Sequence, residues 1–413
     1  MRNFRMDFTR KLSFLVFMLC VLISLKNQNA ETGRKASFQN PVERKLQEDD
    51  GLHEWLRYDY YNESCPLAER IIRSIVQELY GLRPDVAPAL LRLVFHDCFV
   101  EFVLKECLLV AFKVFFYLLF LEDGILVAYS CTMGISSFRN FSGFSEISEK
   151  DSLPNESLKG YDVIDIIKSE LEEACPGIVS CADIVALAAR ESVLMAGGPF
   201  YPLYTGRRDS IVAYPIIATY ELPSPLDDLS KTVESFASRG FDERETVSLL
   251  GAHSTGTIHC KFFFHRLYNF SGGDGPDPSI DPEFLQLLRS NCNSIHHSSG
   301  PASASPSLSP LPSSEDNNIS TVLSQDAGMK MDYEGPRTGF GTLYYRSLLQ
   351  RKGLLFVDQQ LTSGAETETW VQAYASDLSL FQRDFGLAMI KLSNLKVLTA
   401  PKGQVRLNCR KVN

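Results

Sequence analysis

The segment LLRLVFHDCFV, residues 90–100, places a cation and an imidazole one helical turn apart. Arg92 and His96 are four residues apart, so both side chains project from the same face of a helix. The rest of the segment is mostly apolar, and an unpaired cation that faces a protein interior is costly. The space in front of them should therefore hold an anionic, polar or redox-active group. The alternative is a structural pair, with Arg92 on a carboxylate and His96 on a backbone carbonyl, and this segment alone favours neither.

A second histidine is followed by small residues. The segment VSLLGAHSTGTIHC places His253 at the end of an apolar helix, before Ser254, Thr255 and Gly256. Small residues allow a flat, bulky group to approach the backbone closely. One histidine on each of two core helices suits a haem between them, in which one ligates the iron and the other acts on a bound oxidant. Because the chain has no C-x-x-C-H motif, such a haem would be held non-covalently.

Most of the chain has the apolar periodicity of helices that could position these side chains. Residues 67–80 carry a predicted stripe at intervals of four, which comprises Leu67, Ile71, Ile75 and Leu79. Ser180 precedes Asp183 by three residues, a pattern typical of a helix start. Residues 365–395 form a long helical region with a break. Strand-like alternation is scarce, so the predicted fold class is all-α.

Composition sets the broad class of the protein. The chain has 413 residues, of which 45% are hydrophobic, enough for one large domain or two packed lobes. Its net charge is −9, and no run of Lys and Arg suggests a nucleic-acid surface. We therefore expect no nucleic acid among its partners.

The N-terminus has the pattern of a secretory signal peptide over residues 1–30. Basic residues precede the apolar run LSFLVFMLCVLISL, and Ala30 provides a small residue for cleavage. The alternative, a membrane anchor, needs a longer apolar run. A secreted chain meets oxidising conditions, so its cysteines are expected to form disulfides. Of the ten cysteines, Cys20 would leave with the signal peptide, and the odd number that remains implies at least one free or intermolecular thiol.

Two segments differ from the helical pattern around them. Residues 101–145 are densely apolar, and residues 102–121 are the only candidate membrane span after the signal peptide. We interpret this insert as a translated intron or a gene-prediction error in preference to an evolved insertion. Residues 293–318 are rich in Ser and Pro and are expected to form a disordered loop, in which His296 and His297 are solvated.

The chain resembles the secreted plant haem peroxidases, or class III peroxidases. The matching segments occur in the family's order from about Leu52 to Asn413, outside the two unusual segments, and are YYNESCP, RLVFHDCFV, EKDSLPNESLKGYDVID, CPGIVSCADIVALAAR, GGPFYPLYTGRRDS, LLGAHSTGTIHC, RLYNFSGGDGPDPSID and GQVRLNCRKVN. The resemblance implies a two-lobed fold with haem b between a distal lobe, residues 52–205, and a proximal lobe, residues 206–413. It further implies a monomer that reacts with hydrogen peroxide and phenolic donors, outside the cell in the wall or apoplast, or in the vacuole.

The resemblance also assigns roles on the distal side of the haem. His96 matches the histidine that moves a proton between the two oxygens of hydrogen peroxide, and Arg92 matches the arginine that stabilises the developing negative charge. Phe95 would form an apolar wall. Asn155 matches the asparagine that accepts the other ring N–H of the distal histidine. Asn155 also lies in a glycosylation sequon, which burial in this role would block; the other sequons are at Asn62, Asn140, Asn269 and Asn318.

On the proximal side the resemblance makes His253 the axial iron ligand. Asp358 matches the buried carboxylate that accepts the second ring N–H of this histidine. His259 and His265 are the nearest alternative ligands. Pro223 falls where the family lines the edge at which aromatic substrates enter.

The cysteines match three of the four family disulfides, namely Cys65–Cys175, Cys181–Cys409 and Cys260–Cys292. The Gly-Cys-Asp-x-Ser loop that carries the partner of Cys98 is absent, and Cys107 or Cys131 could replace that partner only fortuitously.

The family binds two calcium ions, and the missing loop carries most ligands of the distal one. The chain retains Asp97, the carbonyl of Val100 and, through water, Glu149, which are too few for the six to eight oxygens that Ca²⁺ takes. We therefore expect the distal site to be lost. Ser254 and Asp332 are the candidate ligands at the proximal site, where Gly341 stands in place of a common aspartate. A catalytically impaired haem-binding protein and a membrane-tethered form are the alternative functions.

Overall fold

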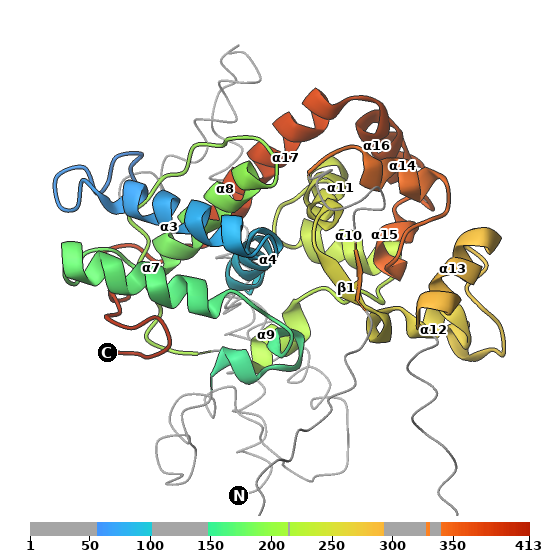
Figure 1. The fold of residues 1–413 in the computed structure, drawn as a ribbon, viewed down its shortest axis with the longest axis horizontal. Coiled ribbons are helices and arrows are strands. Elements are labelled where there is room, and N and C mark those ends of the chain that lie inside the picture. Colours follow the sequence, from blue (N-terminus) through green and yellow to red (C-terminus); the bar gives the residue numbers. More distant parts are fainter. Residues whose placement is uncertain (1–55, 101–147, 214, 293–327, 331–339) are drawn as a thin grey trace, which may run out of the picture. The chain divides into compact units, whose positions relative to one another are not determined.

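A computed structural model describes residues 56–100, 148–213, 215–292, 328–330 and 340–413 (Figure 1). The predicted signal peptide, the apolar insert 101–145 and the Ser/Pro-rich loop 293–318 lie outside these residues, as does Asp332. Within the described residues, no helix is both long and apolar enough to cross a membrane. The candidate span 102–121 is not among them.

Three helices from the first half of the chain pack around α8. Helix α8, Cys181–Met195, contacts α3, Ala68–Leu82, α4, Val86–Phe99, and α7, Tyr161–Ala174. The predicted start of α8 is confirmed, since the Ser180 side chain accepts a hydrogen bond from the backbone N–H of Asp183 at 3.2 Å. Most residues of α8 are buried, so this helix forms the centre of the group.

The stripe predicted for α3 is displaced by one residue. Its fully buried positions are Ala68, Ile72 and Val76, whereas Leu67 is 41% exposed. The predicted positions and the buried positions are both apolar, and they form two neighbouring rows along the same face of the helix. The apolar periodicity predicted the correct face of α3. Packing against α7 and α8 determines which of the two rows on that face is buried.

The second half of the chain supplies the helices that hold His253. Helix α11, Glu243–Leu250, packs against α16, Ala365–Ser376, and α17, Leu378–Ser393, and α16 also contacts α14, Leu343–Leu349. Asp377 breaks the predicted long helix and caps α17 by accepting a hydrogen bond from the N–H of Leu380 at 3.0 Å. Helix α17 also contacts α4, so the two halves share one core.

The other elements are short. They are the helices α9 (Pro215–Glu221), α10 (Leu229–Ala237), α12 (Phe264–Leu267), α13 (Pro282–Cys292) and α15 (Phe356–Gln360), 3-10 turns at Glu149–Asp151, Leu153–Asn155, Gly251–Ser254, Cys260–Phe262 and Phe270–Gly272, and the strands β1 (Thr257–His259) and β2 (Gly328–Lys330). The strands pair antiparallel, with Ile258 opposite Met329. The described residues therefore confirm the all-α fold class.

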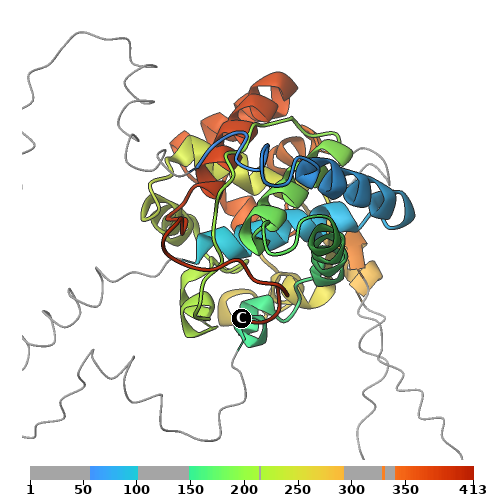
Figure 2. The ribbon, with the colours of Figure 1, turned by 90° about the vertical axis from the view of Figure 1, so that its left-hand side faces the viewer.

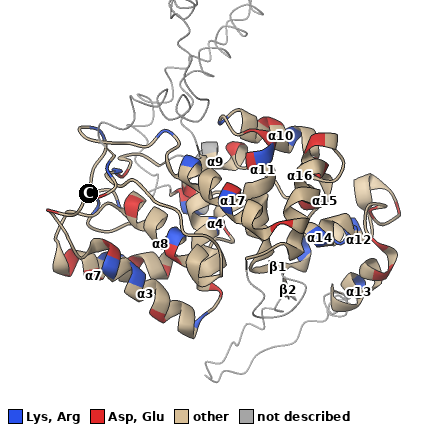
Figure 3. Ribbon diagram, turned by 90° about the horizontal axis from the view of Figure 1, so that it is seen from above, with Lys and Arg blue, Asp and Glu red and all other residues tan. Residues whose placement is uncertain are grey.

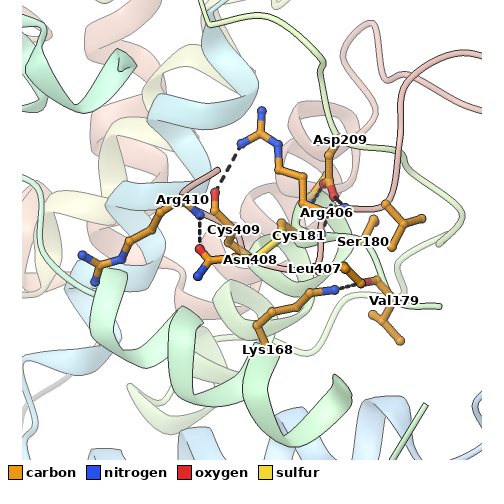
Figure 4. The surroundings of a disulfide bond; sticks show 12 residues. Lys168, Val179, Ser180, Cys181, Asp209, Arg406, Leu407, Asn408, Cys409 and Arg410 are labelled. Atoms are coloured by element: carbon orange, nitrogen blue, oxygen red, sulfur yellow. Dashed lines mark hydrogen bonds between the residues drawn. A yellow bond between two sulfur atoms is a disulfide. The ribbon is translucent and has the colours of Figure 1, made fainter. Parts of the chain in front are cut away.

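The three expected disulfides are present. They are Cys65–Cys175, Cys181–Cys409 and Cys260–Cys292. The second joins residues 228 positions apart and fastens the C-terminal segment to α8 (Figure 4). Beside it, Lys168 donates to the carbonyl of Val179 at 2.7 Å and Arg406 to that of Cys409 at 3.2 Å. A cross-link that closes so long a loop contributes about 2–4 kcal/mol to stability, largely by restricting the unfolded chain.

The C-terminal segment ends beside α7 (Figure 1), on the side of the fold that faces the viewer in Figure 2. Arg410 forms an ion pair there with Asp165 of α7. Basic and acidic residues are distributed over both halves of the fold (Figure 3), although α7 alone carries five acidic residues and one basic residue.

Candidate active site

The distal residues lie on the face of α4 that is turned away from its buried side. Leu90, Leu93 and Val94 pack into the core, whereas solvent reaches Arg92 and His96. The Nε of Arg92 donates to Nε2 of His96 at 3.3 Å. The other guanidinium nitrogens of Arg92 donate to the carbonyls of Ser157 at 3.4 Å and Pro154 at 3.3 Å. Within the described residues Arg92 thus has no carboxylate partner. This disagrees with the alternative interpretation of the sequence, in which Arg92 forms a structural ion pair.

Asn155 fixes the tautomer of His96. Its Oδ1 lies 2.7 Å from Nδ1 of His96, and its Nδ2 donates to the carbonyl of Glu149 at 2.8 Å. Because the amide nitrogen is held by that carbonyl, the amide oxygen faces the imidazole and Nδ1 must carry the hydrogen. Nε2 of His96 is then the basic nitrogen. Asn155 is 7% exposed, so its sequon is buried, as expected from this role.

Burial and the neighbouring cation depress the basicity of His96. Its pKa falls to about 4, first because burial disfavours the charged imidazolium and second because Arg92 is positive; the hydrogen bond to Asn155 works in the opposite direction. A neutral His96 over most of the pH range is the form that can accept a proton.

We expect the second-order rate constant with hydrogen peroxide to depend on pH through this group. The neutral imidazole is the active form, so the rate should be constant near neutrality and fall to half at a pH of about 4. Stopped-flow measurements between pH 3 and 8 on the haem-loaded protein would check this. An inflection near the ordinary histidine pKa of about 6.5 would show that burial and Arg92 do not control His96.

Phe95 forms the expected wall beside His96. Its ring centroid lies 6.1 Å from that of His96 at a steep angle, and it stacks on Phe99 at 4.6 Å. Phe99 is fully buried and packs in turn on Phe236 of α10 at 4.9 Å.

An arginine from the second half of the chain holds the end of α4. The Nε of Arg239 donates to the carbonyl of Phe99 at 2.8 Å, and its guanidinium carbon lies 4.0 Å from the Phe99 ring centroid. Its NH2 also pairs with Glu221 at 2.6 Å. A cation that binds a carbonyl in the last turn of a helix both satisfies that carbonyl and complements the helix dipole. The sequence analysis did not predict this contact.

Replacing Arg239 with Leu is expected to destabilise the fold by about 3 kcal/mol. The change leaves the buried carbonyl of Phe99 and the partly buried Glu221 without their donor, and breaking such a pair costs about 3–5 kcal/mol when it is fully buried. Denaturant unfolding at equilibrium would measure the loss. Arg383→Leu is the control, because Arg383 is 60% exposed in its pair with Asp384 and should change stability by less than about 1 kcal/mol. Equal losses in the two variants would contradict the assignment.

The proximal residues meet after α11. Asp242 and Glu245 form a capping box that starts this helix, and the 3-10 turn Gly251–Ser254 that follows it carries His253. A Cβ at Gly251 would clash with the hydroxyl of Tyr345, so only glycine fits there. Nδ1 of His253 lies 2.8 Å from Oδ1 of Asp358, at α15. The carboxylate therefore takes the Nδ1 hydrogen and leaves Nε2 of His253 free as a ligand.

His253 is only partly enclosed by the protein. Its side chain is 35% exposed, whereas that of Asp358 is 2% exposed, so the opening lies on the side of the ring away from the carboxylate. Burial lowers the pKa of His253, Asp358 raises it by more, and the charge of Arg92 lowers it; the net direction is upward. The influence of Arg92 places the distal cation within electrostatic range of the proximal histidine.

The segment that follows His253 also reaches α4. Gly256 has a φ of +107°, and a Cβ on it would lie 3.0 Å from the Cβ of Pro88. This contact sets the distance between the start of α4 and the proximal turn. The two histidines, each with Nδ1 hydrogen-bonded and Nε2 free of the backbone, fit the two sides of a haem. The residues present therefore fit the group that the sequence predicted.

The remaining predicted site residues are only partly placed. Pro223 lies two residues after α9, which contacts the 3-10 turns that carry Glu149 and Asn155. Asp97 is exposed in the last turn of α4, and Glu149 begins the 3-10 turn Glu149–Asp151. Val100 ends α4 in an extended conformation. The hydroxyl of Ser254 is buried and has no hydrogen-bond partner among the described residues, which fits a cation ligand.

Cys98 has no disulfide partner among the described residues. Burial, followed by the charge of Asp97, raises the pKa of its thiol to about 12, so the thiol stays protonated. Cys107 and Cys131 lie outside the described residues.

Comparison with known proteins agrees with this geometry. The family model described as peroxidase matches residues 72–377. The chain belongs to the peroxidase family. Among its relatives from Arabidopsis thaliana, Peroxidase 48 is 46% identical over 391 residues, which cover 92% of this chain and 89% of the relative. Peroxidase 57 is 36% identical over 87% of this chain and 93% of its own length, and Peroxidase 22 is 38% identical over 87% of each.

These relatives make the protein a plant haem peroxidase of the class III type and therefore an enzyme. The family implies a haem cofactor, hydrogen peroxide and a reducing donor. Nothing in the comparisons favours the impaired or membrane-tethered alternatives.

The sequence did not reveal every residue of this peroxidase site. Tyr344 donates its hydroxyl to Oδ1 of Asp358 at 2.8 Å, and its ring lies 6.5 Å from that of His253. Arg239 and the contact between Gly256 and Pro88 were also missed. Each of these three contacts joins residues from separate segments of the chain, and no sequence motif connects the two residues.

Proposed function

We propose that this peroxidase reduces hydrogen peroxide to water and oxidises small phenolic donors at the site between α4 and the His253 turn. The arrangement that supports this most strongly is the pair of histidines, with Asn155 on Nδ1 of His96 and Asp358 on Nδ1 of His253. Each partner fixes one ring nitrogen, which leaves Nε2 of His96 as a base and Nε2 of His253 as the iron ligand.

His96 and Arg92 would divide the work on the peroxide. Nε2 of His96 takes the proton from the nearer peroxide oxygen and gives it to the farther one, which leaves as water. Arg92 stabilises the negative charge that develops on the departing oxygen. A haem b held by His253 would supply the redox chemistry. Two donor molecules then return one electron and one proton each, so one peroxide yields two waters and two donor radicals.

The donor would enter beside Pro223. This residue follows α9, whose contact with the turn carrying Asn155 brings the segment to the distal side of the site. We propose phenolic donors of the lignin or suberin type, a monomeric enzyme, and secretion to the cell wall or apoplast, with the vacuole as the alternative destination.

Calcium is proposed at the proximal site only. The orphaned hydroxyl of Ser254 supports a cation there, whereas the distal set of Asp97, Val100 and Glu149 has too few oxygens. Elemental analysis of the purified protein should give one calcium per chain. Two per chain would mean that the distal site persists.

The full chain, produced in a secretory host and loaded with haem, should show a Soret band and oxidise guaiacol only when hydrogen peroxide is added. A protein that binds haem and leaves guaiacol unchanged would contradict the proposed donor class. A protein without a Soret band would contradict the cofactor assignment.

A further inference from the structure

The carboxylate behind the proximal histidine has two donors on one oxygen. Oδ1 of Asp358 lies 2.8 Å from Nδ1 of His253 and 2.8 Å from the hydroxyl of Tyr344. Asp358 is 1% exposed and Tyr344 is 4% exposed, so water does not compete for this oxygen. The two hydrogen bonds therefore share one acceptor inside the protein.

Sharing an acceptor weakens each bond. A phenol O–H that donates to a carboxylate oxygen withdraws electron density from it, and the effect is stronger in a buried site than in water. The oxygen then pulls less on the Nδ1 hydrogen of His253. An imidazole whose Nδ1–H is held less strongly has less anionic character and gives less electron density to a metal on its other nitrogen.

We propose that Tyr344 is a positioning residue that limits the electron density passed from Asp358 to His253. This inference rests on the proposed role of His253 as the iron ligand. It adds a third member, from α14, to the pair that the sequence predicted. Tyr344 acts through Asp358, and its ring stands nearly perpendicular to that of His253, at 79°.

Helix α14 provides a control at the next position. Tyr345 is fully buried, and its hydroxyl donates to the carbonyl of Val247 at 3.1 Å and lies 3.5 Å from that of Ser248, both in α11. Loss of this hydroxyl removes a buried hydrogen bond of similar kind from the same helix, but none that reaches Asp358. The two Tyr→Phe variants therefore separate a general loss of stability from an effect on the ligand.

The test uses the full chain loaded with haem and measures the iron–histidine stretching frequency of the ferrous protein by resonance Raman spectroscopy. Tyr344→Phe should shift this band to higher frequency and lower the ferric/ferrous midpoint potential, because Asp358 then pulls fully on His253. Tyr345→Phe should leave both unchanged. Fluorotyrosine at position 344, a stronger donor of similar shape, should shift the band in the opposite direction.

The outcomes separate this inference from the proposed function. A wild-type protein with no iron–histidine band would overturn the assignment of His253 and, with it, the role of Tyr344. A wild-type band that does not move in Tyr344→Phe, or that moves equally in Tyr345→Phe, would overturn the role of Tyr344 alone.

Discussion

His96→Ala is expected to slow the reaction with hydrogen peroxide by several orders of magnitude while haem stays bound. Proton transfer by a positioned side chain is worth about 10²–10⁴ in rate, and the loss of a group that also orients the peroxide adds to this. His96 contributes no bond to the iron in this account, so the variant should keep its haem. Stopped-flow mixing with peroxide would give the second-order rate constant, and the Soret band would report haem content.

A histidine outside the site provides the control for this variant. His265, on α12, lies beside Phe270, and their ring centroids are 6.5 Å apart. His265→Ala should react with peroxide at nearly the wild-type rate. Near-normal reactivity of His96→Ala would show that another group moves the proton.

His253→Ala is expected to change the haem spectrum and to weaken haem retention. The substitution removes the only nitrogen that this account places on the iron, while Asp358 stays buried and loses one of its two donors. Added imidazole should enter the vacated space and partly restore the spectrum. Absorption spectra before and after gel filtration, with and without imidazole, would measure both effects.

The two alternative ligands test the specificity of this result. His259→Ala and His265→Ala should keep the wild-type spectrum and retain haem, because neither histidine carries the Asp358 hydrogen bond. An unchanged spectrum in His253→Ala, together with a changed one in either of the others, would move the ligand to that residue.

Local signals in the sequence predicted the elements well. Ser180 caps α8 and Asp377 divides α16 from α17 because each side chain bonds a backbone N–H only three residues away. The exact buried line of α3 was not predictable, since two adjacent lines of its face are apolar and distant helices choose between them. Disulfide pairing came from the family resemblance and was confirmed, whereas cysteine spacing alone leaves many pairings open.

Some residues of the candidate site could likewise be predicted from local sequence motifs, and others could not. His96, Arg92 and His253 could be identified because their motifs are short and continuous, and the positive charge of Arg92 reaches His253. Tyr344 and Arg239 act across long stretches of chain, on Asp358 and on the end of α4, and nothing in their own segments indicates those partners. Contacts of this kind depend on how helices cross, which periodicity does not specify.

The reaction of the haem-loaded full chain with hydrogen peroxide, followed by stopped-flow absorption, tests the central claim most directly. The wild-type protein should change spectrum at a rate that rises linearly with peroxide concentration and should be fully converted by one equivalent. The Arg92→Leu, His96→Ala double variant should bind haem and react at a rate near that of haem without a distal base. Equal rates for the two proteins would contradict the claim that Arg92 and His96 form the peroxide site.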